Sequence, residues 1–372
     1  MNGLRVRRWT RDEFSAGREA WQSLLARADA DPLFMSWDWI SAWWRHHEAV
    51  LQAELCVLAI HSPDGGLAGI APLYQHRVVH RGILSARRLE LLGNAWRNPA
   101  AVFGEYLDVI ASRDLRADVC GAVAEWLRAS GDWDEIALCN LQQNSVAEQL
   151  AGSLADRAYV RCAESMTGWC IVLPDSFDSF ITRLSSNTRR KVVNQREKLA
   201  GISFELVEPA QRSAALERLD AFVARRFGTP DGDDCRMRAG FHADIVAALP
   251  DASLVHLTEL RAAGHCMSVM LNLRVGVTEY YLQSGFDPAY ARGLSPGLLH
   301  LGHAIEAACR DGVKRFDFLA GRGLHRDYKQ DFAAESVPLQ TLHIVRKPAL
   351  RALFRVVDGL RGRTSHKAPG RG

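Results

Sequence analysis

The sequence lacks any long apolar segment. In 372 residues, no uninterrupted apolar stretch approaches the roughly 20 residues that cross a bilayer as a helix. The first residues, MNGLRVRRWT, also lack the apolar core of a secretory signal peptide. We therefore expect a soluble, cytoplasmic protein.

The sequence also lacks the cysteine spacings of a structural metal site. Its eight cysteines never occur as a CxxC pair or as a Cys/His cluster, so we predict no bound metal. Several lie inside apolar runs such as residues 55–58, where a free thiol behaves as a small buried hydrophobe. This usage is typical of a reducing compartment rather than of a disulfide framework.

Most of the chain lacks a net positive charge. The net charge is +3, yet residues 346–372 alone carry eight Lys or Arg against Asp358. The remaining residues are therefore slightly acidic. No general basic field indicates nucleic acid as the main partner, so any anion site must be local.

The length and composition predict two mixed α/β domains. A chain of 372 residues, 48% hydrophobic and 24% charged, exceeds what one hydrophobic core usually organises. In the first half we predict a Trp-rich helix and an antiparallel hairpin that turns at residues 63–66. The expected helices are 36–47 and 115–130, and the expected strands are 55–61, 67–79, 88–92, 106–110 and 135–140.

The second half repeats this order in outline. Residues 253–284 read as a meander of three antiparallel strands, preceded by helices and followed by one more helix and two strands. We expect a mixed sheet with an internal duplication. The expected helices are 176–184, 210–227, 237–249 and 296–311, and the expected strands are 253–261, 265–274, 278–284, 315–319 and 337–345.

A loop with two glycines, directly before the helix at 296–311, is a candidate anion site. A helix N-terminus offers unpaired N–H groups and the positive end of the helix dipole, and glycines let a phosphate approach the backbone. The same residues also fit an ordinary helix start, with Ser295 as cap and Pro296 in the first position. The candidate anion-binding residues are Arg292, Gly293, Leu294, Ser295 and Gly297.

Three motifs in the second half point to a family. They are LSSNTRRK at 184–191, LSPG at 294–297, and FDF at 316–318 followed by Tyr328 and Lys329. Together they resemble the FemAB-like and BioF-like acetyltransferase domain of the GNAT superfamily, which also occurs in the cellulose biosynthesis protein CelD. FMSWDW at 34–39 is similar to the opening of such proteins.

This resemblance covers most of residues 30–345 and implies two tandem GNAT-like domains. Residues 1–165 would be a degenerate copy, residues 166–346 the catalytic copy, and residues 347–372 a basic amphipathic tail. The catalytic copy would use acetyl-CoA or another acyl-CoA as co-substrate and hold its pyrophosphate at the loop before residue 296.

The resemblance also implies candidate catalytic residues. Acyl transfer to an amine needs a base, a polarised carbonyl and a proton for the departing thiolate. Tyr328 is placed like the phenol that protonates the thiolate, and Lys329 could stabilise negative charge. Asp317 is either the base or an acceptor for a backbone turn. Glu279 is either a second base or a solvated strand residue.

Two basic segments leave alternatives open. Residues 187–198 carry five basic side chains without interleaved aromatic residues, which favours an anionic acceptor or the phosphates of CoA over RNA; a solvated helix face is the simpler interpretation. In the tail, apolar residues at helical spacing predict an amphipathic helix. That helix either docks on the protein or lies on an anionic membrane surface.

The sequence thus predicts an N-acyltransferase that acts on an amine of a sugar, an amino acid or a cell-envelope or exopolysaccharide precursor. One rival is an aminoacyl-tRNA-dependent peptide ligase of the FemAB type, for which tRNA would be a partner. A second rival is a non-catalytic accessory protein of polysaccharide biosynthesis.

Overall fold

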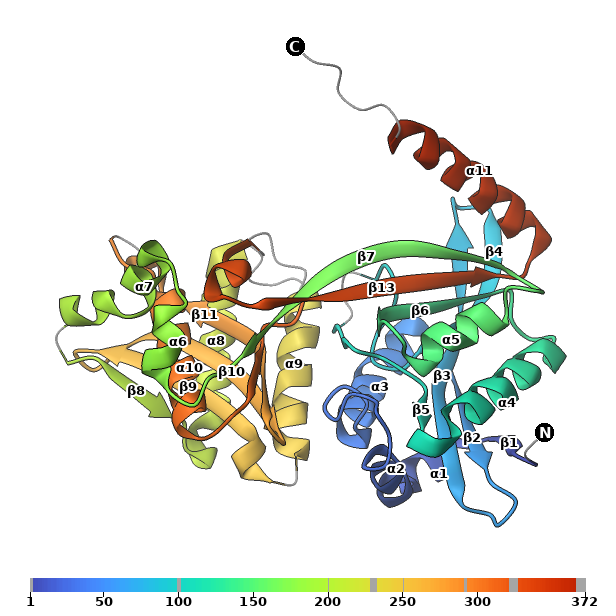
Figure 1. The fold of residues 1–372 in the computed structure, drawn as a ribbon, viewed down its shortest axis with the longest axis horizontal. Coiled ribbons are helices and arrows are strands. Elements are labelled where there is room, and N and C mark those ends of the chain that lie inside the picture. The colour runs from blue at the N-terminus through green and yellow to red at the C-terminus, as the bar shows by residue number, and fades with distance from the viewer. Residues whose placement is uncertain are drawn as a thin grey trace.

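The computed structural model describes residues 3–98, 102–199, 201–227, 233–249, 251–290, 293–320 and 327–365. In these ranges the chain forms two lobes joined by one continuous sheet (Figure 1). The strand order is β1-β2-β3-β4-β6-β13-β7-β12-β11-β10-β9-β8, and β5 pairs with β3.

The strands are β1 (Arg5–Arg8), β2 (Glu54–His61), β3 (Leu67–His80), β4 (Leu84–Leu91), β5 (Ile110–Ala111), β6 (Glu135–Gln142), β7 (Tyr159–Val172), β8 (Ser203–Leu206), β9 (Val255–Ala262), β10 (His265–Val275), β11 (Thr278–Phe286), β12 (Arg315–Asp317) and β13 (Glu335–Val345). The α-helices are α1 (Arg11–Ala16), α2 (Arg18–Leu25), α3 (Trp37–Leu51), α4 (Arg116–Ala129), α5 (Val146–Ser153), α6 (Phe177–Thr182), α7 (Ser186–Val192), α8 (Arg212–Phe227), α9 (Asp233–Ala248), α10 (Pro296–Arg310) and α11 (Pro348–Ser365). The 3₁₀ turns used below are η2 (Asn194–Lys198) and η6 (Asp327–Phe332).

Most predicted elements are confirmed, because short-range signals specify them. The Trp-rich helix begins as α3, where the Ser36 hydroxyl accepts a hydrogen bond from the Trp39 N–H at 3.2 Å. Its apolar side chains Trp39 and Trp43 are fully buried. The hairpin β2–β3 and the meander β9–β10–β11 also form as expected.

The predicted strand at 106–110 is wrong except for Ile110. Tyr106 has a φ of 56°, which an extended strand cannot accommodate. The apolar residues of this segment are instead buried in a loop between the lobes. Burial, not strand pairing, explains their hydrophobicity.

Two long strands join the lobes. β7 and β13 run antiparallel over 11 register pairs, from Cys170 with Glu335 to Tyr159 with Val345. One end of this ribbon pairs with β6 of the first lobe through β13, and the other end pairs with β12 of the second lobe through β7 (Figure 1). The expected boundary at 165/166 falls within β7.

Both lobes contain the same local arrangement. In the first lobe β4 pairs in parallel with β6 over only three residues, Arg88–Glu90 with Glu135–Ala137. In the second lobe β11 pairs in parallel with β12 over three residues. A helix, α4 or α10, lies between the paired strands in sequence. The internal duplication is therefore present in the fold.

The lobes contact each other directly. His46 of α3 lies 2.9 Å from Asp244 of α9, and the rings of Trp39 and Phe241 meet edge to face at 4.8 Å. One hydrophobic core cluster contains residues of both lobes. Burial of this shared apolar surface stabilises the relative position of the two lobes.

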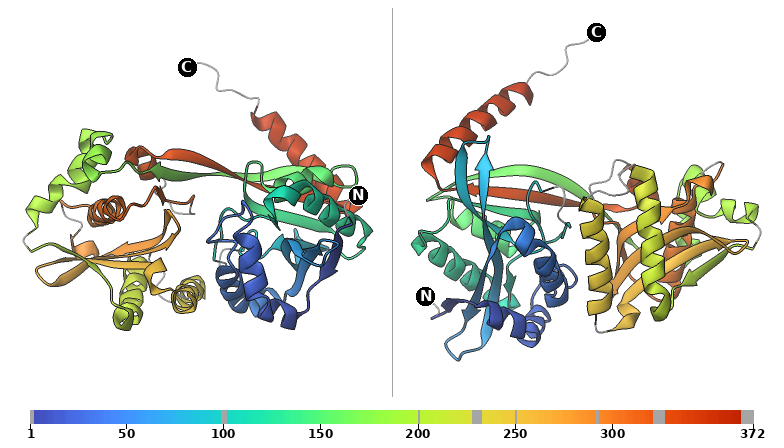
Figure 2. Two further views of the ribbon diagram at one scale, coloured as in Figure 1. Left: turned by 60° about the horizontal axis from the view of Figure 1, so that its bottom comes forward. Right: turned by 180° about the vertical axis from the view of Figure 1, so that it is seen from behind.

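The tail helix α11 docks by its first half. Leu350 and Phe354 are buried against Ala86 and Val345 of the first lobe. Beyond this contact the helix projects away from the body (Figures 1 and 2). In the described part of the chain, no helix has both the length and the apolar character that a membrane span requires.

Candidate active site

In the second lobe, β11 and β12 pair over only three positions before they separate. The two strands pair through Thr278–Arg315, Glu279–Phe316 and Tyr280–Asp317, after which β12 ends. β11 continues to Phe286 beside β10. Side chains alternate along a strand, so Tyr280 and Asp317 share one face, whereas Glu279 and Phe316 share the other.

The loop before α10 is held by a side chain from the basic segment. The Ser295 N–H donates to Gln195 Oε1 at 3.0 Å, and Gln195 Nε2 donates to the Gly293 carbonyl at 3.4 Å. The Ser295 hydroxyl does not cap α10. One amide of the expected anion site is therefore already occupied, and Pro296 has no N–H to offer.

The remaining loop residues retain the features of an anion site. Gly293 has a φ of 78°, a conformation that favours glycine. A Cβ added at Gly297 would meet only the Phe286 ring, at 3.5 Å. The amides of Gly297 and Leu298 belong to the first turn of α10, where a helix provides no internal acceptor. Leu294 and Ser295 are partly exposed, and Arg292 lies outside the described residues.

Asp317 lies in a buried contact between the lobes. The Tyr106 hydroxyl of the first lobe lies 3.0 Å from each carboxyl oxygen of Asp317, and the Leu319 N–H donates to Oδ1 at 2.8 Å. The side chain is almost completely buried. Burial raises the pKa of Asp317, although these two hydrogen bonds act to lower it.

A second acid–phenol pair lies beside the first. The Tyr280 hydroxyl donates to Asp31 Oδ2 at 2.9 Å, and the N–H groups of Leu33 and Phe34 donate to Oδ1. Desolvation raises the pKa of Asp31 to about 7, and the nearby charge of Asp317 acts in the same direction. Two carboxyls with raised pKa values are typical of a site for proton transfer.

Lys329 and Glu105 fix the backbone that follows β12. Lys329 Nζ donates to the carbonyls of Phe318 and Leu319 at 2.7 Å, and to that of Ala320 at 3.2 Å. The Ala320 N–H donates to Glu105 Oε2 of the first lobe at 2.7 Å. Leu319 has a φ of 58°, so these contacts stabilise a strained bend beside Asp317.

Tyr328 and Glu279 make different contacts. Tyr328 is half-buried on η6, and its ring packs edge to face on Phe332 at 6.4 Å. Glu279 is buried rather than solvated, and it accepts from Asn272 Nδ2 at 2.7 Å and from Arg274 Nη2 at 2.7 Å. Both carboxylate oxygens of Glu279 therefore already accept hydrogen bonds from side chains of β10.

The structure thus assembles a polar cluster that the sequence did not reveal. We call it the inter-lobe cluster. Its members are Asp31, Glu105 and Tyr106 of the first lobe and Tyr280, Asp317 and Lys329 of the second. Asp317 and Lys329 were expected from the motifs, whereas the other four carry no motif and lie far away in sequence. Among the described residues, no group of three or more His, Cys, Asp or Glu is placed to hold a metal ion.

Comparison with known proteins agrees with this geometry. Residues 186–330 match the family model described as an acetyltransferase (GNAT) domain. No curated protein matches the sequence. The fold is similar to the crystal structure of FemX, with a TM-score of 0.62 at 11% identity over 94% of this chain and 99% of that one.

Two further solved structures have the same fold. One is a conserved protein of unknown function from Bacteroides thetaiotaomicron, with a TM-score of 0.57 and 10% identity over 92% of this chain and 99% of that one. The other is the C-terminal domain of a putative lysylphosphatidylglycerol synthetase from Agrobacterium fabrum, with a TM-score of 0.51 and 11% identity over 92% and 95%. The chain therefore has a tandem GNAT-like, FemAB-like fold, and residues 186–330 of its second lobe match a GNAT acetyltransferase domain.

Proposed function

We propose that the protein is an acyl-CoA-dependent N-acyltransferase. It would move an acyl group, acetyl in the simplest case, to an amine of a sugar, an amino acid or a cell-envelope or exopolysaccharide precursor. One observation carries this proposal: the strands β11 and β12 separate next to a buried carboxylate, Asp317, inside the segment that matches a GNAT domain.

The described residues fit an acyl-CoA donor. The first turn of α10 offers the amides of Gly297 and Leu298 to a pyrophosphate, and Gly297 leaves its surface open. When bound, acyl-CoA supplies an acyl group activated as a thioester.

The chain's own residues would then handle protons. Asp317 would take the proton of the attacking amine, and Tyr106 orients its carboxyl. Tyr328 would donate a proton to the departing thiolate, as phenols can at such sites. Direct attack in a ternary complex requires no covalent enzyme intermediate.

The proposal is tested by free-thiol release. The purified full-length protein is incubated with acetyl-CoA and a panel of amino sugars, amino acids and aminoacylated precursors, and the Asp317→Asn variant serves as the control for non-enzymatic hydrolysis. We expect amine-dependent release by the wild-type protein alone. Release that is equal in the two proteins for every amine would contradict the proposal.

The fold similarity to FemX and the basic helix α7 favour one second candidate, aminoacyl transfer from tRNA. This activity would require binding of charged tRNA with a steep salt dependence, because phosphate contacts release counterions. A gel-shift titration at two salt concentrations distinguishes the two candidates. A non-catalytic accessory protein would show neither thiol release nor tRNA binding.

Gly297→Asp should weaken acyl-CoA binding by about tenfold, because a like charge roughly 4 Å from a phosphate costs on the order of 1 kcal/mol or more. The new carboxylate would repel a pyrophosphate, yet an acid in the first turn of a helix is favourable for the helix itself. Calorimetric titration with CoA measures the loss. Gly297→Ala is the matched control and should bind nearly as wild type. If Gly297→Asp binds CoA as tightly as the wild type, the first turn of α10 is not part of the donor site.

Tyr328→Phe should lower turnover by on the order of 10²-fold and leave the donor affinity nearly unchanged, if the phenol protonates the thiolate. Steady-state thiol release gives kcat, and CoA titration gives the affinity. Tyr281→Phe, at a half-buried phenol of the same lobe, provides a control for loss of a hydroxyl. If Tyr328→Phe keeps the kcat of the wild type, Tyr328 does not protonate the thiolate.

A further inference from the structure

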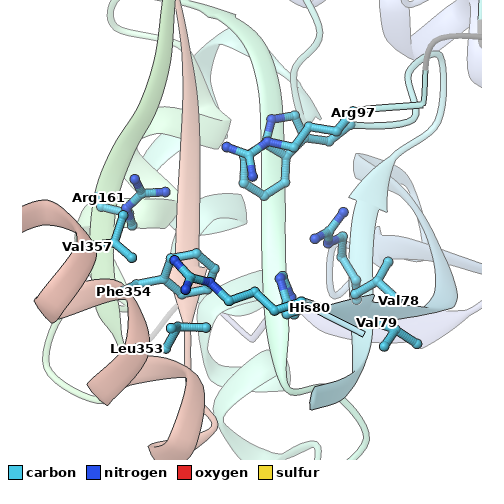
Figure 3. Close-up of a pocket in the computed structure, with 11 residues that line it drawn as sticks. Val78, Val79, His80, Arg97, Arg161, Leu353, Phe354 and Val357 are labelled. Atoms are coloured by element: carbon cyan, nitrogen blue, oxygen red, sulfur yellow. The ribbon is translucent and has the colours of Figure 1, made fainter. Parts of the chain in front are cut away.

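The first lobe contains a pocket that the proposed chemistry does not use. The pocket is about 450 Å³ and lies between the end of β3, the loop after β4, and α11. Its wall holds four arginines and a histidine, drawn in Figure 3. They are His80, Arg81, Arg88, Arg97 and Arg161.

The charged side chains that line this pocket are all basic. No carboxylate is among the side chains that line it in the described part of the chain. The acids that compensate the arginines lie behind the wall: Glu135 contacts Arg88, Glu164 contacts Arg97, and Asp358 contacts Arg161. The pocket lining therefore contains donors and no carboxylate, although three of its four arginines are each paired with an acid that does not line it.

Two of the arginines retain unused donors. Arg161 is 8% exposed, and its Nη1 has no hydrogen-bond partner among the described residues, although its Nε and Nη2 bind Asp358 at 2.7 and 2.8 Å. A buried guanidinium nitrogen without an acceptor is costly. Arg81 makes no hydrogen bond or ion pair with the residues that the structure describes. Both side chains line the pocket, and Arg161 is labelled in Figure 3.

The surface around the pocket is apolar. Eight large apolar side chains are exposed in the described ranges, and four of them lie on the two elements that border this pocket. Val79 and Ile83 are on the β3–β4 hairpin, where Ile83 is 81% exposed, and Val356 and Leu360 are on α11. The hairpin and the helix project on the same side of the first lobe (Figures 1 and 2).

We propose that this pocket binds the phosphate headgroup of an anionic phospholipid and thereby docks the first lobe on a membrane surface. The phosphate would lie between Arg81 and Arg161, and the apolar rim would enter the acyl region. The chain after Leu360 carries further basic residues and no acid, which adds attraction to an anionic surface. This inference goes beyond the proposed transfer reaction and does not depend on it.

Vesicle sedimentation tests the proposal with the full-length protein. The probes are vesicles of phosphatidylcholine alone and vesicles of phosphatidylcholine mixed with phosphatidylglycerol. We expect binding to the mixed vesicles only, and weaker binding as salt rises. Arg81→Ala should bind about fivefold more weakly, and Ile83→Asp about tenfold more weakly. Neither side chain contributes to a core, so both variants should melt as wild type.

Matched controls lie on the second lobe. Leu206→Asp places the same charge on an exposed apolar residue of the edge strand β8, and Arg310→Ala removes an exposed arginine of α10. Both should sediment as wild type. Equal binding to the two vesicle types, or wild-type binding by Arg81→Ala and Ile83→Asp, would overturn the proposal.

A calorimetric titration with inorganic phosphate separates lipid from free anion. If Arg81→Ala loses phosphate binding while vesicle binding is unaltered, the pocket is a site for a soluble anion and the docking proposal is wrong. If Arg81→Ala weakens both phosphate binding and vesicle binding, the proposal that the pocket binds a lipid headgroup is supported.

Discussion

Asp317→Asn is expected to lower the turnover of acyl transfer by a factor on the order of 10²–10⁴, the usual contribution of a positioned general base. Asparagine keeps the shape of the side chain, and its carbonyl can still accept from the Leu319 N–H. The variant loses only the ability to take a proton. Steady-state thiol release should therefore show a lower kcat with an unchanged KM for the donor.

Asp31→Asn is the matched control for this prediction. Asp31 is the other carboxyl of the inter-lobe cluster that bonds a phenol, and its pKa of about 7 means that it is only partly charged at neutral pH. Asp31→Asn should therefore lower kcat much less than Asp317→Asn does. A loss smaller than about tenfold in Asp317→Asn would reject the base and leave Asp317 as an acceptor for the turn at Leu319.

The pH profile gives an independent check. A base acts when deprotonated, so kcat should fall as the pH drops through the pKa of Asp317. Burial raises this pKa, so the fall should occur at a higher pH than for an exposed aspartate, whose pKa is about 3.9. Tyr106→Phe removes a hydrogen bond to the carboxylate and should move the fall to a still higher pH.

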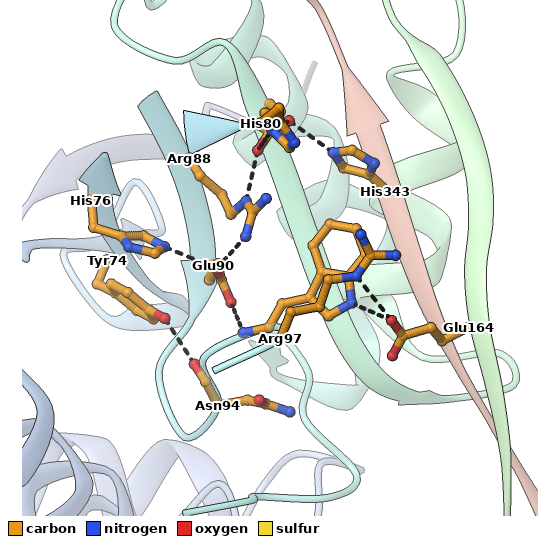
Figure 4. A network of polar contacts seen from close by, with 11 residues as sticks. Tyr74, His76, His80, Arg88, Glu90, Asn94, Arg97, Glu164 and His343 are labelled. Carbon is orange, nitrogen blue, oxygen red and sulfur yellow. Dashed lines mark hydrogen bonds and ion pairs between the residues drawn. The ribbon is translucent and has the colours of Figure 1, made fainter. Parts of the chain in front are cut away.

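Arg88→Met is expected to lower the free energy of unfolding of the first lobe by about 3–5 kcal/mol, the cost of leaving a buried charge without its partner. Arg88 is buried between β4 and β6, where its Nε donates to Glu135 Oε1 at 2.7 Å and its Nη1 lies 3.4 Å from Glu90 Oε1 (Figure 4). Methionine fills the space of the aliphatic stem but supplies no charge. The buried carboxylates of Glu135 and Glu90 would then lack the positive charge between them.

Two histidines complete this network, of which His343 adds a hydrogen bond rather than a charge. His343 and His80 contact Glu135 through Nε2 at 3.0 and 2.9 Å. Burial lowers the pKa of His343, so it is neutral at pH 7 and donates a hydrogen bond without a charge. Arg88 is therefore the side chain that balances Glu135 electrostatically at neutral pH.

Tryptophan fluorescence measures this effect selectively. Nine of the ten Trp residues precede residue 134, so urea unfolding followed by fluorescence reports the first lobe. The double variant Arg88→Met with Glu135→Gln removes one unpaired charge and should recover part of the stability. A loss below about 1 kcal/mol in Arg88→Met would show that water or the histidines compensate the two acids.

Lowering the pH should reduce the difference in the free energy of unfolding between Arg88→Met and the wild type. Burial acts to raise the pKa of Glu135, but the hydrogen bonds from His343 and His80 and the charge of Arg88 outweigh it, so the pKa is lowered. A glutamate whose pKa is lower in the folded than in the unfolded state stabilises the fold at pH values above its unfolded pKa of about 4.3. This stabilisation is lost as the pH falls toward the folded-state pKa. In the variant the acid is already destabilising, so its protonation relieves the penalty.

The sequence alone determined most local elements, including the loop before α10. Periodicity, a helix-capping serine at 36 and turn glycines act between near neighbours, so α3, the β9–β11 meander and α10 were predictable. The motifs also singled out Asp317 and Lys329. The strand expected at 106–110 failed because its apolar residues are buried by the other lobe rather than by strand pairing.

Only the tertiary structure decided the surroundings of Asp317. Tyr106 is 211 residues from Asp317, and Asp31 is 249 residues from Tyr280. These pairs meet because β7 and β13 run through both lobes and α3 packs on α9. Such contacts depend on the burial of apolar surface that the two lobes share, and no local pattern encodes which distant side chains that burial brings together.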